Sequence, residues 1–161
     1  ESKRCSETIC NEYKKKGVDV KVARLFNVYG EKMTLDDSRV LPTFIRNAIQ
    51  NQDLNIYGDG NQQDSFCYVM DIVSGLKELM KVNCNNPVNM GSNEFVSIKH
   101  LAKLVITLIG SKSRINIISS DSVFYNRSTI PVNNLVNWEP SISLTKGIQL
   151  LSKSFTKQLN P

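Results

Sequence analysis

The side chains best suited to metal binding or nucleophilic catalysis are sparse in this sequence. Its four cysteines, Cys5, Cys10, Cys67 and Cys84, form no Cys-x-x-Cys or Cys-x-x-His pair, and the single histidine, His100, lies in an apolar helical pattern. Zinc sites draw on such ligands at short spacing. The sequence therefore predicts free thiols, which are typical of a reducing compartment, and no metal site.

The sequence also lacks the motifs that bind phosphates or nucleic acids. No Gly-rich strand-to-helix turn of the GxxGxxG or GxxxxGK type is present to cradle phosphates. The 161 residues carry a net charge of +5, and the run Lys14-Lys15-Lys16 lies near a helix end, where the helix dipole favours cations. Without a basic face interleaved with aromatics, no nucleic-acid partner is expected. No apolar stretch approaches the roughly 20 residues that span a bilayer, so no membrane contact is predicted.

The first element that must position functional side chains is a helix at the very start of the chain. Cys5, Ile9 and Tyr13 recur every four residues ahead of Gly17, which predicts an amphipathic helix ending near that glycine. Valines alternating with polar residues then predict a strand over 18–26. A helix that feeds a strand directly resembles the second half of a βαβ unit, so the chain is expected to begin within a fold.

Further helices and strands alternate along the rest of the chain. Apolar spacing predicts strands over 54–57, 65–70, 87–90 and 114–118, and helices over 40–49, 72–80, 98–109 and 144–159. We expect Asp71 and Ser97 to be N-caps and Gly110 to end a helix. This alternation predicts an α/β fold. The strands are short and few, which fits a substrate-binding lobe with part of a larger sheet better than a complete doubly wound domain.

Several sequence blocks occur in a fixed order: Lys3-Arg4, Ala23–Gly30 (ARLFNVYG), Ile56–Gly60 (IYGDG), Phe66–Asp71 (FCYVMD), Pro87–Gly91 (PVNMG) and Trp138-Glu139-Pro140. Over essentially the whole chain they resemble the C-terminal half of extended short-chain dehydrogenases/reductases, the NAD-dependent epimerase/dehydratase group that acts on nucleotide sugars. Within that group, Met33–Val40 (MTLDDSRV) most resembles the UDP-glucuronate decarboxylases, which have a similar Met, acidic pair and Arg-Val.

The resemblance implies a fold and a domain division. Residues 1–30 would be the last helix and strand of a Rossmann-like NAD(P)-binding domain. Residues 31–161 would mostly form a smaller mixed α/β lobe that binds the nucleotide sugar, with strand-helix returns to the main sheet. The tyrosine of the family's Tyr-x-x-x-Lys pair would precede Glu1, so we expect this chain alone to be inactive.

The resemblance also assigns roles to individual residues. Lys3 would be the catalytic lysine, which lowers the pKa of the tyrosine and holds the nicotinamide ribose. The other implied contacts are to the NAD cofactor for Thr34 and Arg39, and to the substrate for Asn27, Val40, Tyr57 and Arg127.

The residues by themselves leave simpler interpretations of these positions open. Asn27 could form an Asx turn, Arg39 a surface ion pair, and Tyr57 a core aromatic closing a strand. Lys3, without the surrounding blocks, would be an ordinary surface lysine.

One departure from the family pattern concerns the substrate diphosphate. Where the family has Gln-x-Arg-x-Phe, this sequence has Gln62–Phe66 (QQDSF), with Asp64 in the place of the arginine. A carboxylate repels a diphosphate, and losing an arginine contact costs on the order of 2–5 kcal/mol. We expect a compensating cation, a different substrate or weakened binding.

The implied activity is that of an NAD-dependent carboxy-lyase on a UDP-sugar. UDP-glucuronate would be oxidised at C4, lose CO2 and be reduced again to UDP-xylose. Alternatives are a 4,6-dehydratase, a 4-epimerase, or a non-catalytic relative that binds or dimerises. The family also implies a homodimer through the Lys3 helix. We expect a cytoplasmic protein, or one of the Golgi lumen if the missing N-terminal part carries a membrane anchor.

Overall fold

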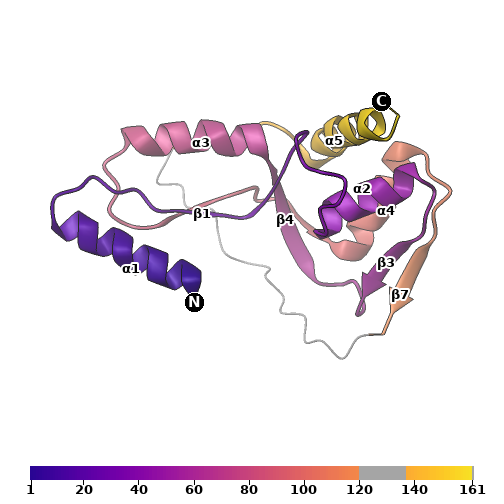
Figure 1. Cartoon of the computed structure of the whole chain (residues 1–161), viewed down its shortest axis with the longest axis horizontal. Coiled ribbons are helices and arrows are strands. Elements are labelled where there is room, and N and C mark those ends of the chain that lie inside the picture. Colours follow the sequence, from indigo (N-terminus) through magenta and orange to yellow (C-terminus); the bar gives the residue numbers. More distant parts are fainter. Residues whose placement is uncertain (120–136, 161) are drawn as a thin grey trace.

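The computed structural model describes residues 1–119 and 137–160. Among these, no helix combines the length and apolar character needed to cross a membrane. Figure 1 shows α2, α4 and α5 grouped at one end of the molecule and α1 at the other. The elements, in chain order, are α1 (Ser2–Lys15), β1 (Ala23–Leu25), β2 (Asn27–Tyr29), α2 (Val40–Ile49), β3 (Leu54–Tyr57), β4 (Gln63–Tyr68), α3 (Val69–Lys81), β5 (Val88–Met90), β6 (Phe95–Ser97), α4 (Ile98–Ile109), β7 (Ile115–Ile118) and α5 (Leu144–Leu159).

The described strands form three small sheets, with the orders β1-β5, β2-β4-β6 and β3-β7. Three of the strand pairs are parallel, and only β4 with β6 is antiparallel. Parallel neighbours need long crossover connections, which helices supply here. The predicted α/β class is therefore confirmed.

Two clusters of buried side chains hold these elements together. The larger joins α2, α4 and α5 to β3 and β4, and its fully buried members include Ile45, Leu54, Leu101, Ile148 and Phe155. The smaller joins α3 to β1, β4 and β5 through the side chains Cys67, Ile72, Leu79, Val88 and Met90.

Helix ends follow the sequence closely. The Ser97 hydroxyl accepts a hydrogen bond from the His100 N–H at 3.2 Å, which confirms the predicted N-cap of α4. Gly110 ends the same helix at φ 69°. After α1, Gly17 has φ 85°, and the N–H of Val18 bonds the Tyr13 carbonyl at 3.2 Å, the pattern of a Schellman motif.

The strand predicted over 18–26 is wrong in extent. It is two short strands in different sheets, β1 and β2, separated by Phe26, and residues 18–22 lie outside any strand. The partner strand explains the late start, since β5 begins at Val88, which pairs with Ala23. Alternation along one segment carries no information on where its partner begins.

Asp71 is not the N-cap of α3, because that helix begins at Val69 and its cap position is Tyr68. The predicted strand 65–70 ends at the same point, at Tyr68. Instead, the buried Asp71 carboxylate accepts hydrogen bonds from the Ser141 hydroxyl at 2.8 Å and the Ile142 N–H at 2.9 Å. It thereby ties the segment ahead of α5 to α3.

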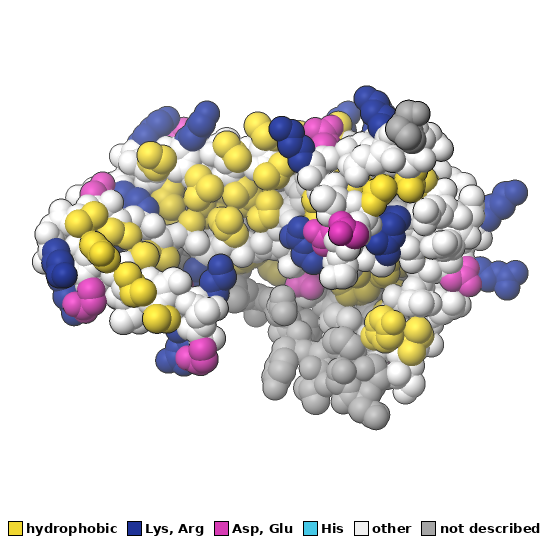
Figure 2. Space-filling view, viewed as in Figure 1, with side chains coloured by type: hydrophobic (Ala, Val, Ile, Leu, Met, Phe, Trp, Pro, Cys, Tyr) yellow, Lys and Arg dark blue, Asp and Glu magenta, His cyan; other side chains and the backbone are white. Residues whose placement is uncertain are grey.

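Helix α1 is the element with the least packing. None of its residues is buried, and the Ile9 and Tyr13 side chains are 52% and 53% exposed. Figure 2 shows hydrophobic side chains in a row along this helix. A bidentate ion pair from Arg24 of β1 to Glu7, at 2.7 Å for each bond, links it to the sheet. Arg24 thus has a structural role in joining α1 to β1.

Candidate functional site

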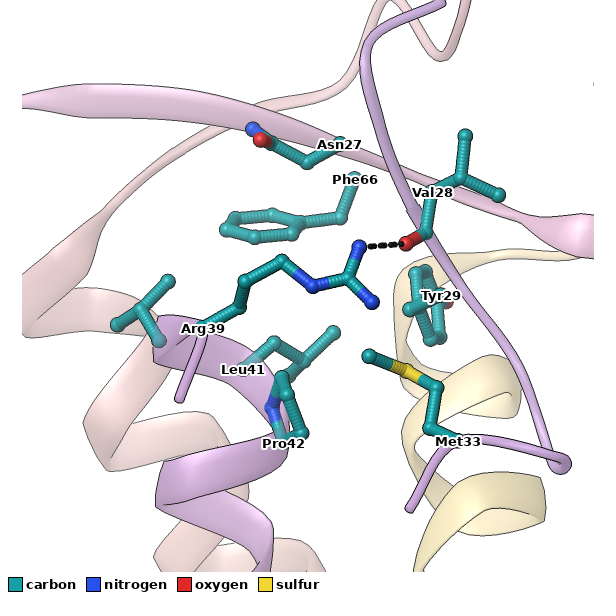
Figure 3. Close-up of a pocket in the computed structure, with 9 residues that line it drawn as sticks. Asn27, Val28, Tyr29, Met33, Arg39, Leu41, Pro42 and Phe66 are labelled. Atoms are coloured by element: carbon teal, nitrogen blue, oxygen red, sulfur yellow. Dashed lines mark hydrogen bonds between the residues drawn. The ribbon is translucent and has the colours of Figure 1, made fainter. Parts of the chain in front are cut away.

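A cavity opens where β2 passes into the loop that leads to α2. Its volume is about 130 Å³. Figure 3 shows side chains converging on it from β2, β4, the loop and the first turn of α2. The walls are mostly apolar, and the lining residues are Asn27, Val28, Tyr29, Met33, Arg39, Val40, Leu41, Pro42 and Phe66.

Local sequence explains how these residues meet. Asn27 of β2 lies opposite Phe66 of β4 in the parallel register. At the end of β2, a Cβ on Gly30 would collide with the Val69 side chain, so only glycine lets the chain pass α3 here. Pro42 is accommodated in the first turn of α2, where no helical N–H bond is required.

Arg39 is the cation of this cavity. Its Nε and one terminal nitrogen donate to the Asp37 carboxylate at 3.0 and 2.7 Å, and the other terminal nitrogen donates to the Val28 carbonyl at 3.1 Å. Each terminal nitrogen carries two hydrogens. Among the described contacts, one N–H on each therefore remains for a ligand.

A second, more open cavity meets the first at the same arginine. Its volume is about 320 Å³, and Gly30, Lys32 and Val69 line it. Four residues border both cavities, namely Val28, Tyr29, Met33 and Arg39. The Arg39 side chain therefore borders both cavities.

Asn27 is held by its neighbour strand. Its side-chain amide donates to the Ser65 carbonyl at 3.1 Å, which fixes the direction of the amide group. The amide nitrogen has a second hydrogen, and the oxygen is an acceptor. Asn27 is therefore oriented by β4, and the Asx turn considered from sequence is not the contact that holds it.

Ionisation in the site follows burial and pairing. The hydrogen bonds from Arg39 hold the pKa of Asp37 below its usual value, and the same contact raises the pKa of Arg39. Burial raises the pKa of Tyr29 far above its ordinary range and that of Cys67 to about 12. At neutral pH the Asp37–Arg39 pair is ionised, and Tyr29 and Cys67 are neutral.

The remaining residues implied by the resemblance lie elsewhere. Lys3 is exposed in the first turn of α1, and Tyr57 is exposed at the end of β3; neither lines the cavity. Thr34 is exposed beside it, with its carbonyl accepting from the Asp37 N–H at 3.2 Å. Arg127 lies outside the described residues. The structure thus brings together Asn27, Arg39 and Val40 only.

Asp64 is partly exposed on β4, where its backbone lies opposite Val96 of β6. It does not line the cavity.

Sequence reasoning gave no role to several residues that build the site. The sequence left a surface ion pair open for Arg39, and the structure shows that pair, with Asp37 as the partner at 2.7 Å. Phe66 is 39 positions beyond Asn27, so only the register of β2 and β4 places them together. The Asp-x-Arg spacing was the one available signal, since a carboxylate two residues before an arginine can pair with it.

Comparison with known proteins places the chain in a family. The model of the NAD dependent epimerase/dehydratase family matches residues 1–91, more than half of the chain. The chain belongs to this family. Relatives with the same overall pattern include UDP-glucuronic acid decarboxylase 1 of Danio rerio, 39% identical over 99% of this chain and 39% of that protein. UDP-glucuronic acid decarboxylase 3 of Arabidopsis thaliana is 34% identical, over 99% of this chain and 48% of that protein.

Solved structures agree on the fold. The UDP-glucose 4-epimerase of Thermotoga maritima, with UDP-glucose, superposes with a TM-score of 0.84 at 25% identity, covering 97% of this chain and 51% of that one. The UDP-glucuronic acid 4-epimerase of Bacillus cereus, in complex with UDP-glucuronic acid and NAD, superposes with a TM-score of 0.82 at 22% identity. The match covers 94% of this chain and 50% of that one. This chain therefore spans about two fifths to half of the length of the family members it matches.

Proposed function

We propose that this chain is the substrate-binding half of an NAD-dependent UDP-glucuronate decarboxylase. The observation that carries the proposal is the cavity at the end of β2, where Asn27, Arg39 and Val40 line one space. The relatives named UDP-glucuronic acid decarboxylase, which align over 99% of the chain, support the choice of reaction.

The described residues fit part of an NAD site. Arg39 retains hydrogen-bond donors beside two adjoining cavities, and a nicotinamide dinucleotide offers ribose, amide and phosphate acceptors. Bound NAD would supply reversible hydride acceptance at C4 of the sugar. Thr34 and Lys3 are proposed to complete the contacts to the cofactor from this chain.

The chain's own residues would bind and orient the two ligands. Arg39 would donate to the cofactor, and Asn27, whose amide is fixed by β4, would donate to the substrate diphosphate. The apolar walls, including Met33 and Phe66, would exclude water from the reacting sugar. Val40, Tyr57 and Arg127 are proposed as further substrate contacts.

We propose a division of the chain between two domains. Residues 1–30 would complete a dinucleotide-binding domain, and residues 31–161 would mostly form the nucleotide-sugar lobe. The packing of β1 with β5 and α3 in the smaller cluster supports a strand-helix return to the main sheet.

We also propose a homodimer through α1. The exposed Ile9 and Tyr13 side chains support it, since an apolar helix face gains free energy when a second copy covers it. Ile9→Glu should give a monomer by analytical ultracentrifugation of the full-length protein, whereas the exposed Glu12→Gln on the same helix should leave the dimer intact. A dimer that persists in Ile9→Glu contradicts this assignment.

Product analysis of the full-length protein tests the reaction. With UDP-glucuronate we expect CO2 and UDP-xylose in equal amounts, without net consumption of NAD. UDP-galacturonate as product, with no CO2, would establish 4-epimerisation instead. A 4-keto-6-deoxy sugar from UDP-glucose would establish 4,6-dehydration.

Asp64 favours the non-catalytic alternative, because a carboxylate near a diphosphate repels it. Calorimetry of the full-length protein with UDP and UDP-glucuronate distinguishes the non-catalytic alternative from the proposed enzyme. The absence of binding heat with both would rule out a working sugar-nucleotide site. If both bind, Asp64→Arg should tighten UDP binding, since it removes the repulsion and restores a cation.

A further inference from the structure

The Asp37 carboxylate lies behind the Arg39 guanidinium, with the Val28 carbonyl on another side of it. Bonds from the Nε and both terminal nitrogens fix the plane of the guanidinium at the boundary of the two cavities. We propose that Asp37 is a positioning residue, which holds Arg39 so that its remaining N–H groups face the bound ligand. This inference rests on the proposed cofactor contact of Arg39.

Asp37 is the fixed member of the pair. Its side chain is 18% exposed, whereas that of Arg39 is 57% exposed. Its own N–H bonds the Thr34 carbonyl at 3.2 Å, and its carbonyl accepts from the Thr43 hydroxyl of α2 at 3.3 Å. A long, mostly exposed arginine would otherwise sample many rotamers, and ordering it at binding would lower affinity.

The pairing also decides what kind of contact Arg39 makes. Two opposite charges 2.7 Å apart present little net charge to a ligand. The guanidinium then acts mainly through the direction of its N–H groups, and less as a counter-charge for an anion. The second cation at the larger cavity, Lys32, has no such carboxylate among its described contacts.

Two interpretations of Asp37 predict opposite changes in cofactor affinity when its charge is removed. If Asp37 only screens the charge of Arg39, its neutralisation strengthens the binding of an anionic cofactor. If it positions Arg39, the same change weakens binding, although a negative charge has been removed.

Asp37→Asn is the discriminating variant. Asparagine keeps the oxygen that accepts the Arg39 backbone N–H at 2.9 Å, so the turn is retained, while the bidentate acceptor for the guanidinium is lost. Asp36→Asn is the matched control, because it removes the same charge from an exposed neighbouring side chain.

The measurement is calorimetric titration of the full-length protein with NAD at two salt concentrations. We expect Asp37→Asn to raise the Kd for NAD roughly 5- to 30-fold, the range for directly coupled residues, and Asp36→Asn to change it less than about twofold. Asp37→Glu should recover part of the loss. In an Arg39→Ala background, Asp37→Asn should have no further effect. Unchanged melting temperatures exclude unfolding as the cause.

The outcomes separate this inference from the proposed function. An unchanged or lower Kd in Asp37→Asn, with a raised Kd in Arg39→Ala, overturns the positioning role alone. An unchanged Kd in Arg39→Ala shows that Arg39 does not contact the cofactor, and overturns both that proposed contact and the positioning role, while the reaction itself is tested by the product analysis. Equal losses in Asp37→Asn and Asp36→Asn would show that the loss does not depend on the contact with Arg39, and would also overturn the positioning role.

Discussion

Two buried tyrosines on the paired strands β2 and β4 should respond in opposite ways to the loss of their hydroxyl groups. Tyr29 and Tyr68 lie on paired strands, 3% and 5% exposed, with their ring centroids 5.8 Å apart in an edge-to-face contact. Within the described part of the chain, the Tyr29 hydroxyl has no hydrogen-bond partner, whereas the Tyr68 hydroxyl interacts with the Glu31 carboxylate, which raises the Tyr68 pKa. The two residues are almost equally buried, so the two variants compare the surroundings of their hydroxyl groups.

The expected magnitudes follow from this difference. Burying a hydroxyl without a partner costs about 1–3 kcal/mol, so Tyr29→Phe should stabilise the protein by roughly 1 kcal/mol after the small void is counted. Tyr68→Phe should destabilise it by about 0.5–1.5 kcal/mol, because the interaction of its hydroxyl with Glu31 is lost. The pair of variants should therefore differ by roughly 2 kcal/mol in the free energy of unfolding.

Urea unfolding of the full-length protein, followed by tyrosine fluorescence and circular dichroism, measures both variants. The midpoint should rise for Tyr29→Phe and fall for Tyr68→Phe, with equal slopes. A fall of 1 kcal/mol or more in Tyr29→Phe would refute the reasoning, because it would mean that the Tyr29 hydroxyl has a partner of its own.

Three further outcomes are expected. Asp71→Asn should lower the free energy of unfolding, measured by urea titration, by about 2–4 kcal/mol, because an amide cannot accept both hydrogen bonds that the carboxylate accepts. A loss under about 1 kcal/mol would contradict the role of Asp71 in joining the segment ahead of α5 to α3. Cys67 is buried and its thiol has a pKa of about 12, so it should resist iodoacetamide at pH 8 while the exposed Cys5 reacts. Peptide mass spectrometry measures both reactions, and equal rates of alkylation at the two cysteines would contradict this. Carboxyl NMR should place the pKa of Asp37 below its usual value, and Arg39→Leu should raise that pKa. Because the folded-state pKa is lowered, the stability that this pair contributes is complete above the unfolded-state pKa. It is lost as the pH falls through the folded-state pKa.

Helices were the most predictable part of the fold. The apolar spacing over 98–109, with Ser97 before it and Gly110 after it, located α4 with its correct ends. The capping groups act on their own helix, so the information is contained in adjacent residues. Strand ends and β6 were not predictable in this way. The extent of β1 depends on where β5 begins, and β6 exists through its pairing with the segment from Gln63 to Ser65.

For the candidate site too, local sequence determined some features and contacts between distant segments determined others. The sequence by itself determined the family, the α/β class and three residues that line the cavity, because these depend on residue type and order. Only the tertiary structure decided that Phe66 lies across from Asn27 and that Asp37 clamps Arg39 between two cavities. Those relations depend on the parallel register of β2 with β4 and on the path of the loop before α2. Contacts between distant segments set that register and that path, and no periodicity within either segment encodes them.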